Sequence, residues 1–542
     1  MVTDFKNESL ADFSRPETVR QMQEALEYVK SQLGAEYPLI IGEERIKTKD
    51  KIRSCNPANP AEVVGIVQLA GVEDGAKAIE TAAKAFESWR WAPEEERADR
   101  LFHAAQVIKR RKFELAAWMV YEVGKSWAEA DGDVCEAIDF CEFYAREALR
   151  YAEVQPCLHW PGEHDIMVYI PLGVGVVIPP WNFPFAILVG MACAAWVTGN
   201  TVVLKPSSDA PVIAAKFMEV IEEIGLPPGV VNFVSGGGGS IGDSLVSNPK
   251  TRFISFTGSK AVGLHIIELA SKMQKGQKWI KRVVAEMGGK DAIIVDNEAD
   301  MDSAAAAVVS SAFGFQGQKC SACSRAIIVE DVYDTMVDKI IEKAKTITVG
   351  PTVMQKNYMG PVVNKKAYEA ILNYIEIGKK EGRLACGGSP CHSCESRNPV
   401  RSRDPRSGGD DSVGYFIQPT IIADVKPGAR IEQEEIFGPV LAIIKARNFD
   451  HAIEIANDTE YGLTGAVYTK NIKKIEQAKL KFHTGNLYIN RKCTGAMVAC
   501  HPFGGFNMSG TCSKAGGRDY LFLFLQSKSI SEVVGRGIVG RP

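Results

Sequence analysis

The amino-acid sequence predicts an α/β protein with two doubly wound, mostly parallel sheets. Residues 75–154 repeat apolar side chains at intervals of three and four, which is typical of amphipathic helices. From residue 168 onward, short runs rich in Val and Ile end in Gly or Pro and alternate with helical patterns. Such runs are typical of strands buried on both faces of a parallel sheet. The alternation of strands and helices therefore predicts the α/β class.

The strand-like runs fall into two series, which predicts two α/β domains with a boundary near residue 288. The first series comprises residues 168–180, 201–206, 230–236 and 252–258. The second comprises residues 291–296, 325–330, 416–425, 439–446, 465–470 and 485–490. Within each series, successive runs are separated by segments long enough for the crossover helices that parallel strands need.

Residues 387–413 interrupt the second series. They lose all periodicity and fill with Ser, Arg, Pro, Gly and Asp, which predicts a disordered surface insertion. Cys391, His392 and Cys394 in this segment are possible metal ligands by residue type alone. No second ligand pair with matching spacing accompanies them, so we expect no metal site there.

Composition and charge exclude several classes of function. The 542 residues are 46% hydrophobic and 24% charged, which suits a globular chain with a substantial core. The formal charge of −3 is spread over 63 basic and 66 acidic residues, so we expect neither a nucleic-acid nor a membrane partner. The odd count of 13 cysteines and the acidic, polar N-terminal segment predict a reducing, cytoplasmic location.

Two cysteines three positions apart, Cys320 and Cys323, follow the glycine-rich run GFQGQK. A structural zinc site would need a second ligand pair, and a thioredoxin-like dithiol would lie near the first strand of a small βαβ unit. If a helix begins at SACSRAI, its amides would lower the pKa of Cys320, and Cys323 would pack in the core one turn later. From these residues alone, a structural role for either cysteine remains the stronger interpretation.

Two successive strand-to-helix turns are candidates for binding a pyrophosphate. Gly237, Gly239 and Gly242 match a dinucleotide fingerprint, but the acidic residue expected about 20 positions later is missing. In FTGSKAVG a strand runs directly into a helix, where Ser259 can both cap the helix and donate to a phosphate. The two turns together predict a bound dinucleotide.

Seven motifs, in order along the chain, resemble the aldehyde dehydrogenase superfamily. They are IPPWNFP (178–184), VLKPSS (203–208), FTGSKAVG (256–263), AEMGGKDA (285–292), GQKCSACSR (317–325), EEIFGPV (434–440) and PFGGFNMSG (502–510). Within the superfamily, FGFQGQKCSACSR, YIEIGKKEG, FHTGNLYINRKCTGA and the opening DFKNESLADFSRPE resemble the branch that oxidises L-glutamate γ-semialdehyde to L-glutamate. The resemblance implies the final step of proline degradation.

The resemblance also implies the domain organisation of the aldehyde dehydrogenase fold. A Rossmann-like domain that binds NAD(P) would comprise residues 1–154 and 171–287, and a catalytic α/β domain residues 288–500. A small β element for oligomerisation would comprise residues 155–170 and 515–542. Its segment SKSISEVV alternates as a strand does and could pair with a neighbouring subunit, so a homo-oligomer is expected.

The catalytic residues follow from the same resemblance. Hydride can leave an aldehyde carbon only after that carbon becomes tetrahedral, so the reaction needs a nucleophile. Cys320 matches the family's nucleophile and would form a thiohemiacetal and then a thioester. The side-chain amide of Asn182 and the backbone N–H of Cys320 would stabilise the oxyanion. Glu286 matches the general base for thioester hydrolysis, a role that suits a carboxylate with a pKa near neutrality.

The resemblance implies NAD as cofactor and assigns positions that contact it. These positions are Ile178, Pro179, Trp181, Lys205, Ser207, Ser208, Gly258, Ser259, Glu435 and Phe437. Lys205 would bind the adenosine ribose, Ser259 the pyrophosphate and Glu435 the nicotinamide ribose. Ser208 departs from the family pattern, in which a Glu often binds the ribose 2′-hydroxyl and repels a 2′-phosphate. Its absence lowers the barrier to NADP, which is therefore a second candidate cofactor.

Five positions match the family's contacts to the amino-acid part of the substrate: Ser321, Gly495, Ala496, Phe185 and Phe503. The hydroxyl of Ser321 and the amides of the Gly-Ala pair would hold the α-carboxylate. The two aromatic rings would flank the aliphatic chain, although a plain core role for them is equally expected from sequence. Glu136 is a weaker candidate for facing the α-ammonium group.

Three alternatives to this function remain. A succinate semialdehyde dehydrogenase would keep Cys320 and Glu286 but lack the loop that serves an α-amino acid. An enzyme that acylates CoA usually lacks the general base, and a noncatalytic binding protein on the same fold would need none of these groups.

A transient contact with a separate proline dehydrogenase, which would supply the substrate, is an expected partner interaction.

Overall fold

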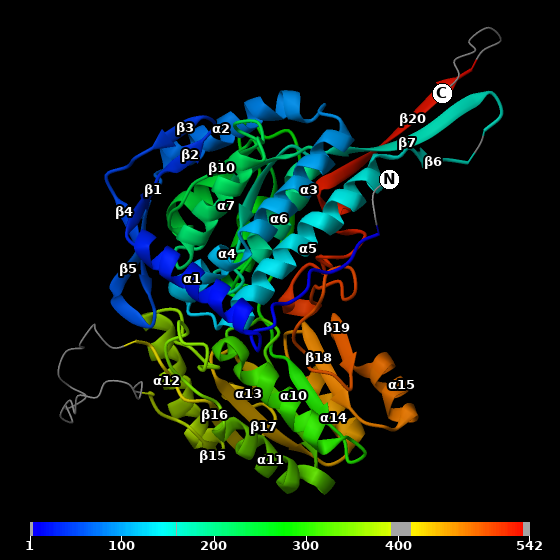
Figure 1. Cartoon of the computed structure of the whole chain (residues 1–542). Coiled ribbons are helices and arrows are strands. Elements are labelled where there is room, and N and C mark those ends of the chain that lie inside the picture. The colour runs from blue at the N-terminus through cyan, green and yellow to red at the C-terminus, as the bar shows by residue number, and fades with distance from the viewer. Residues whose placement is uncertain (1–3, 159, 392–413, 535–542) are drawn as a thin grey trace.

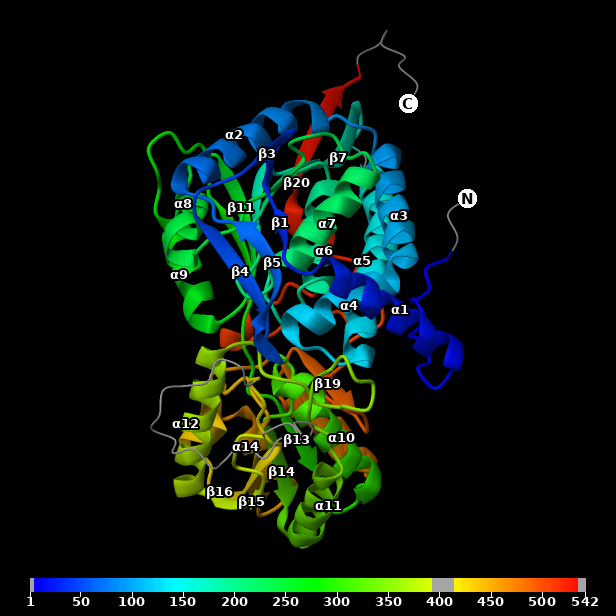
Figure 2. The same ribbon diagram turned by 60° about the vertical axis from the view of Figure 1, so that its left-hand side comes forward.

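The computed structural model describes residues 4–158, 160–391 and 414–534 of the chain. Most of the segment predicted to be a disordered insertion, with His392 and Cys394, lies outside these residues. Figures 1 and 2 show a body in two parts, each built on one sheet, and an arm that projects from the part formed by the N-terminal half.

A seven-stranded sheet organises the first part, with the order β12-β11-β8-β9-β10-β2-β3. Its strands are β2 (Leu39–Ile41), β3 (Glu44–Ile46), β8 (Val174–Ile178), β9 (Thr201–Leu204), β10 (Val231–Phe233), β11 (Thr251–Thr257) and β12 (Arg282–Glu286). The five strands from β12 to β10 are parallel, and β2 and β3 form an antiparallel edge. The parallel pairing places Ile178, Thr257 and Glu286 at one end of the sheet.

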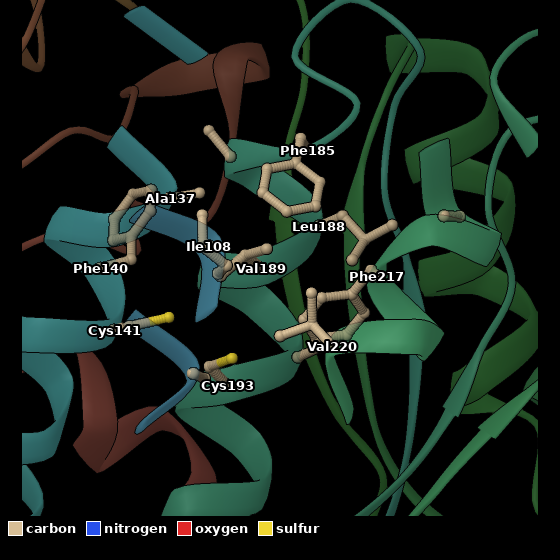
Figure 3. Packing of buried hydrophobic residues seen from close by; sticks show 14 of the residues in the cluster. Ile108, Ala137, Phe140, Cys141, Phe185, Leu188, Val189, Cys193, Phe217 and Val220 are labelled. Atoms are coloured by element: carbon tan, nitrogen blue, oxygen red, sulfur yellow. The ribbon is translucent and has the colours of Figure 1, made fainter. Parts of the chain in front are cut away.

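Helices cover both faces of this sheet. They are α2 (Val72–Trp89), α3 (Glu94–Arg110), α4 (Lys112–Val123), α5 (Trp127–Ala152), α6 (Ala186–Val197), α7 (Pro211–Glu223), α8 (Asp243–Ser247) and α9 (Lys260–Ser271). Helix α6 is apolar all round, as a helix enclosed by other elements must be, and it packs between the sheet and α5. Figure 3 shows the core that α3, α5, α6 and α7 share. The predicted helical layer is therefore present.

The N-terminal segment adds a helix and a small sheet to the outside of this part. Helix α1 (Pro16–Gln32) packs against α4. The small sheet consists of β1 (Ala35–Tyr37), β5 (Asn59–Gln68) and β4 (Lys51–Asn56). Ahead of α1, Asn7 and Glu8 bind the carboxylate of Asp139 on α5, which fixes the first described residues to the helical layer.

A second seven-stranded sheet organises the other part, with the order β15-β16-β17-β14-β13-β18-β19. Its strands are β13 (Ala292–Val295), β14 (Arg325–Val329), β15 (Arg383–Cys386), β16 (Thr420–Val425), β17 (Val440–Ala446), β18 (Thr464–Tyr468) and β19 (Asn486–Ile489). Helices α10 (Met301–Phe313), α11 (Tyr333–Lys345), α12 (Lys365–Glu381), α13 (Arg430–Gln433), α14 (Phe449–Asn457) and α15 (Ile472–Lys481) surround it. All strands except β15 are parallel, and the chain changes sheet between Glu286 and Ala292.

The projecting arm is a sheet of β6 (Gln155–Pro156), β7 (Glu163–Pro171) and β20 (Leu525–Val533). Strand β20 pairs antiparallel with β7 along its whole length, from Leu525 opposite Pro171 to Val533 opposite Glu163. The segment predicted to be a C-terminal strand is thus paired within its own chain, and most of its side chains are exposed. Figure 1 shows this arm extending away from the body. Among the described residues, no helix is long and apolar enough to cross a membrane.

Candidate active site

Two cavities meet at Cys320. A cleft of about 870 Å³ opens at the carboxyl ends of β8, β9 and β11, where parallel α/β sheets usually bind ligands. A narrower cavity of about 120 Å³ lies between α5, α6 and the loops that follow β12 and β19. Cys320 lines both cavities, so its sulfur can reach a molecule in either one.

Cys320 follows a tight turn that ends helix α10. Phe315, Gln316 and Gly317 have φ angles of 50°, 57° and 68°, a left-handed conformation that costs free energy for the two non-glycine residues. A Cβ atom at Gly317 would lie 2.3 Å from a backbone carbonyl oxygen, so only glycine fits. The side chain of Gln316 donates to two backbone carbonyls at 2.7 and 3.2 Å and holds the turn in place.

The predicted helix at SACSRAI is wrong. The chain makes a turn after Cys320 and enters strand β14 at Arg325, whose N–H donates to the carbonyl of Asp291 at 3.1 Å. The buried run RAIIV pairs with β13 and β17, and this pairing overrides any local tendency to form a helix. Cys323 is 1% exposed and packs in the core, as predicted.

The expected lowering of the Cys320 pKa is also wrong. Burial raises the pKa of the Cys320 thiol, and the carboxylates of Asp291, Glu435 and Glu286 raise it further. The N–H of Ser321 donates to the sulfur and opposes this rise without offsetting it. The thiol is therefore protonated in the protein alone and must give up its proton as it attacks.

Asn182 and the backbone of Cys320 form a pair of hydrogen-bond donors at the cleft. Asn182 is 4% exposed, and its Nδ2 donates to the carbonyl of Gln318 at 3.0 Å. That bond fixes the amide and leaves the second hydrogen on Nδ2 free to bind another acceptor. Within the described chain, the N–H of Cys320 donates to no acceptor. The two donors are available to an oxygen bound beside the sulfur, which is the arrangement that an oxyanion hole needs.

Glu286 ends strand β12 and lines the same cavity as Cys320. Its Oε1 accepts from the N–H and the Oγ of Ser513, at 3.2 and 2.8 Å, and its Oε2 accepts from the N–H of Gly505 at 3.3 Å. These bonds favour the carboxylate, but burial outweighs them and raises the pKa of Glu286 to about 7. The group is poised to accept a proton near neutral pH.

All ten positions predicted to contact the cofactor line the large cleft. Lys205 follows β9, and its Nζ donates to two backbone carbonyls at 3.0 and 3.2 Å. Burial lowers the pKa of Lys205 to about 8. Ser259 is the N-cap residue of α9, but its hydroxyl does not cap the helix, contrary to one of its two predicted roles. The hydroxyl and the first amides of α9 are thus available to an anion.

Glu435 also lines the cleft. Its Oε1 accepts from the N–H of Gly289 at 3.1 Å, and burial raises the pKa of Glu435 to about 7. A Cβ atom at Gly288 would lie 2.2 Å from Glu435 Oε2, so the close approach requires glycine. Phe437 has a φ of 55°, and its ring meets that of Trp181 edge-on at a centroid distance of 5.5 Å.

The cleft fits a dinucleotide. It joins helix-start amides for phosphate, a buried lysine and a carboxylate for hydroxyl groups, and apolar walls for a ring. Gly239 and Gly242 of the doubtful fingerprint also line it, beside Lys205. Among the described residues, no group of three or more Cys, His, Asp or Glu side chains is arranged to hold a metal ion.

Four of the five predicted substrate contacts line the small cavity: Ser321, Gly495, Ala496 and Phe503. The prediction for Phe185 is wrong. Phe185 is 0% exposed, precedes the first residue of α6 and packs edge-on against Phe217 in the core that Figure 3 shows. Phe183, two residues earlier and with its chain outside the helix, lines the cavity instead.

The sequence did not reveal most of the cavity wall. Tyr144 and Phe140 from α5, with Met497 and His501 from the loop after β19, also line it. Apolar residues on α5 looked the same in sequence whether they face the cavity or the core. The weaker candidate, Glu136, does line the cavity, and burial with repulsion from a nearby aspartate raises its pKa to about 8.

Comparisons with known proteins agree with this geometry. The model of the aldehyde dehydrogenase family matches residues 45–530. A 1-pyrroline-5-carboxylate dehydrogenase of Geobacillus thermodenitrificans is 57% identical over 533 residues, which cover 98% of this chain and 100% of the relative.

Two solved structures extend the comparison. The structure of a Thermus 1-pyrroline-5-carboxylate dehydrogenase with bound NAD is 49% identical and superimposes with a TM-score of 0.93, covering 98% of this chain and 99% of that one. A proline utilization A protein of Bdellovibrio bacteriovorus is 43% identical with a TM-score of 0.93, and the match covers 98% of this chain and 54% of that one. The chain therefore belongs to the aldehyde dehydrogenase family.

Proposed function

We propose that this chain oxidises L-glutamate γ-semialdehyde, supplied by 1-pyrroline-5-carboxylate, to L-glutamate with NAD, in the last step of proline degradation. One observation carries the proposal: Cys320 lines both a dinucleotide cleft and a small cavity that Gly495 and Ala496 also line. The Geobacillus and Thermus relatives are named for 1-pyrroline-5-carboxylate, the source of this aldehyde, and this supports the choice among aldehydes.

The reaction begins with a bond between Cys320 Sγ and the aldehyde carbon. The thiol proton leaves as the bond forms, and Glu286, with a pKa near 7, lines the same cavity and accepts it. Negative charge develops on the former carbonyl oxygen, where Asn182 Nδ2 and the Cys320 N–H donate. NAD bound in the cleft supplies the hydride acceptor, and the substrate carbon remains on Cys320 as a thioester.

Hydrolysis of the thioester completes the reaction. Glu286, ionised again after it has released the first proton to solvent, removes a proton from water, which attacks the thioester carbon. The carbon–sulfur bond breaks, the released Cys320 sulfur takes the proton back from Glu286, and L-glutamate leaves. Ser513 and Gly505 hold the carboxylate in position without neutralising it, because they donate hydrogen bonds rather than charge.

The amino-acid end of the substrate is held by residues of the anion site in the small cavity. Within the described chain, the N–H groups of Gly495 and Ala496 donate to no acceptor, and Ser321 lines the same cavity. They form an anion site for the α-carboxylate. Glu136 faces the cavity from α5, and an ammonium group beside it would offset the burial that raises its pKa.

A comparison of three aldehydes tests the proposed function. We expect kcat/KM with NAD to be highest for L-glutamate γ-semialdehyde, lower for glutarate semialdehyde, which lacks only the ammonium group, and lowest for succinate semialdehyde. Preference for succinate semialdehyde would contradict the proposal and favour the alternative enzyme.

The oxyanion role of Asn182 predicts a specific loss of rate. Asn182→Ala should lower kcat about 10²- to 10³-fold, because the donor acts on charge that develops only in the transition state. NAD binding, followed by quenching of tryptophan fluorescence, should stay near the wild-type value. Equal losses in NAD affinity and kcat would instead indicate a displaced backbone.

The cofactor prediction rests on Ser208, which lines the cleft beside Ser207 and Lys366. We propose NAD as the main cofactor and NADP as a second one. Ser208→Glu should lower kcat/KM for NADP at least about tenfold, because a carboxylate there repels the 2′-phosphate. Ser208→Gln, which has the same shape without charge, is the control and should retain NADP activity. Equal kcat/KM values for NADP in the two variants would contradict this account.

Three further proposals concern the protein in its setting. The exposed strands of the arm are suited to pair with another copy of the chain, which supports a homo-oligomer. The match to about half of a proline utilization A protein supports transient contact with a proline dehydrogenase. The buried free thiols of Cys135, Cys141, Cys193, Cys323 and Cys493 support a reducing, cytoplasmic location.

A further inference from the structure

Arg491 donates hydrogen bonds to the loop that contains the proposed carboxylate site. We call residues 494–498 the anchor loop; it follows β19 and lines the small cavity with four of its five residues. Arg491 Nη2 donates to the carbonyl oxygen of Gly495 at 2.6 Å and to that of Thr494 at 3.4 Å. Its guanidinium lies 4.4 Å from the centre of the Tyr488 ring, which keeps it in place.

These two carbonyls belong to the peptide groups whose N–H donors face the proposed site. The carbonyl of Thr494 shares a peptide group with the N–H of Gly495, and the carbonyl of Gly495 shares one with the N–H of Ala496. In a trans peptide the C=O and N–H bonds point in opposite directions, and the described chain has no cis peptide. Both N–H groups therefore point away from Arg491, which is not among the residues that line the cavity.

Two other polar groups of the anchor loop are bound elsewhere. The N–H of Met497 donates to Nδ1 of His501 at 3.2 Å, and the carbonyl of Val498 accepts from Asn7 Nδ2 at 3.1 Å. These bonds hold the loop at both of these points. The N–H groups of Gly495 and Ala496 are among those of the loop that donate to no acceptor in the described chain.

We propose that Arg491 is a positioning residue for the α-carboxylate: it holds the anchor loop from behind and polarises the two amides that bind the anion. Hydrogen bonds in a chain strengthen one another, and a bond from a cation to a carbonyl makes the N–H of the same peptide a stronger donor. The positive charge thus acts on the substrate without entering the cavity. This inference rests on the proposed function, since it needs a substrate that carries a carboxylate.

Lys492 provides a matched control for the effect of charge alone. Its Nζ lies 3.6 Å from the position that a Cβ of Gly495 would take, slightly nearer than Arg491 Nη2 at 3.9 Å. No hydrogen bond joins Lys492 to a carbonyl of the anchor loop among the described residues. Removal of the Lys492 charge therefore tests the effect of a nearby positive charge alone. Removal of Arg491 also tests the hydrogen bonds to the peptide groups.

The experiment measures kcat and KM for L-glutamate γ-semialdehyde and for propanal, which has no carboxylate, in wild type, Arg491→Met, Arg491→Lys and Lys492→Met. Arg491→Met should lower kcat/KM for the semialdehyde roughly tenfold, mainly through KM. Its kcat/KM for propanal should stay near wild type, which also shows that the variant is folded. Arg491→Lys should recover part of the loss, and competitive inhibition by L-glutamate should weaken in parallel with KM.

The outcomes separate this inference from the proposed function. A wild-type enzyme that shows no preference for the semialdehyde over propanal would refute both. A wild-type preference that survives Arg491→Met unchanged would refute the role of Arg491 alone. Equal losses for both aldehydes in Arg491→Met, or an equal effect of Lys492→Met, would also refute it, because they indicate general distortion or general charge.

Discussion

Cys320→Ala is expected to lose aldehyde oxidation almost completely, with kcat lower by at least roughly 10⁴-fold. Without the sulfur the aldehyde carbon stays planar and cannot release hydride, so the remaining groups of the site have no intermediate to act on. The measurement is NADH formation with L-glutamate γ-semialdehyde at saturating NAD. NAD binding should persist, because Cys320 is only one of many residues that line the cleft.

Cys323→Ala is the matched control for this loss. Cys323 is buried in the core around the second seven-stranded sheet. It was predicted to pack in the core, and in the structure it is not among the residues that line the small cavity. Its replacement should lower thermal stability through the lost sulfur volume but leave the chemistry intact. A reversal, with an active Cys320→Ala and an inactive Cys323→Ala, would contradict the assignment of the nucleophile.

Glu286→Gln is expected to separate the two halves of the reaction. Thioester hydrolysis needs a base, so the steady-state rate should fall roughly 10²- to 10⁴-fold. Hydride transfer needs no base once the thiohemiacetal exists, so rapid mixing should still show a burst of about one NADH per site. The burst can be slower than wild type because Glu286 also accepts the thiol proton.

The pH dependence provides a second test of Glu286. Its pKa is raised to about 7, so the fraction of active carboxylate grows as the pH rises through about 7. Wild-type kcat should increase over that range, and the increase should disappear in Glu286→Gln. A burst that is absent in the variant, or a rise in kcat that persists there, would contradict the role of Glu286 in hydrolysis.

Much of the cofactor cleft could be predicted because its residues occupy the ends of regular elements. Ile178 ends β8, Lys205 follows β9 and Ser259 precedes α9, so the sheet alone brings them together. Motifs of this kind carry their geometry with them. The same holds for Glu286, which ends β12 beside β11.

The parts that could not be predicted depend on packing between distant segments. The expected helix after Cys320 gave way to β14 because its strand partners come from elsewhere in the chain. Phe183 and Phe185 are the same residue type two positions apart, and only the start of α6 decides which of them enters the core. The contact of Arg491 with the anchor loop depends on carbonyl directions in an irregular segment, which no sequence pattern specifies.

Mass spectrometry of Glu286→Gln, quenched in acid after the NADH burst, tests the central claim most directly. The account predicts one glutamyl group per active site, bound as a thioester to Cys320 and located on the peptide that contains residues 317–325. The adduct should be absent from the double variant that also carries Cys320→Ala. An NADH burst with no adduct, or an adduct on Cys323, would contradict the mechanism.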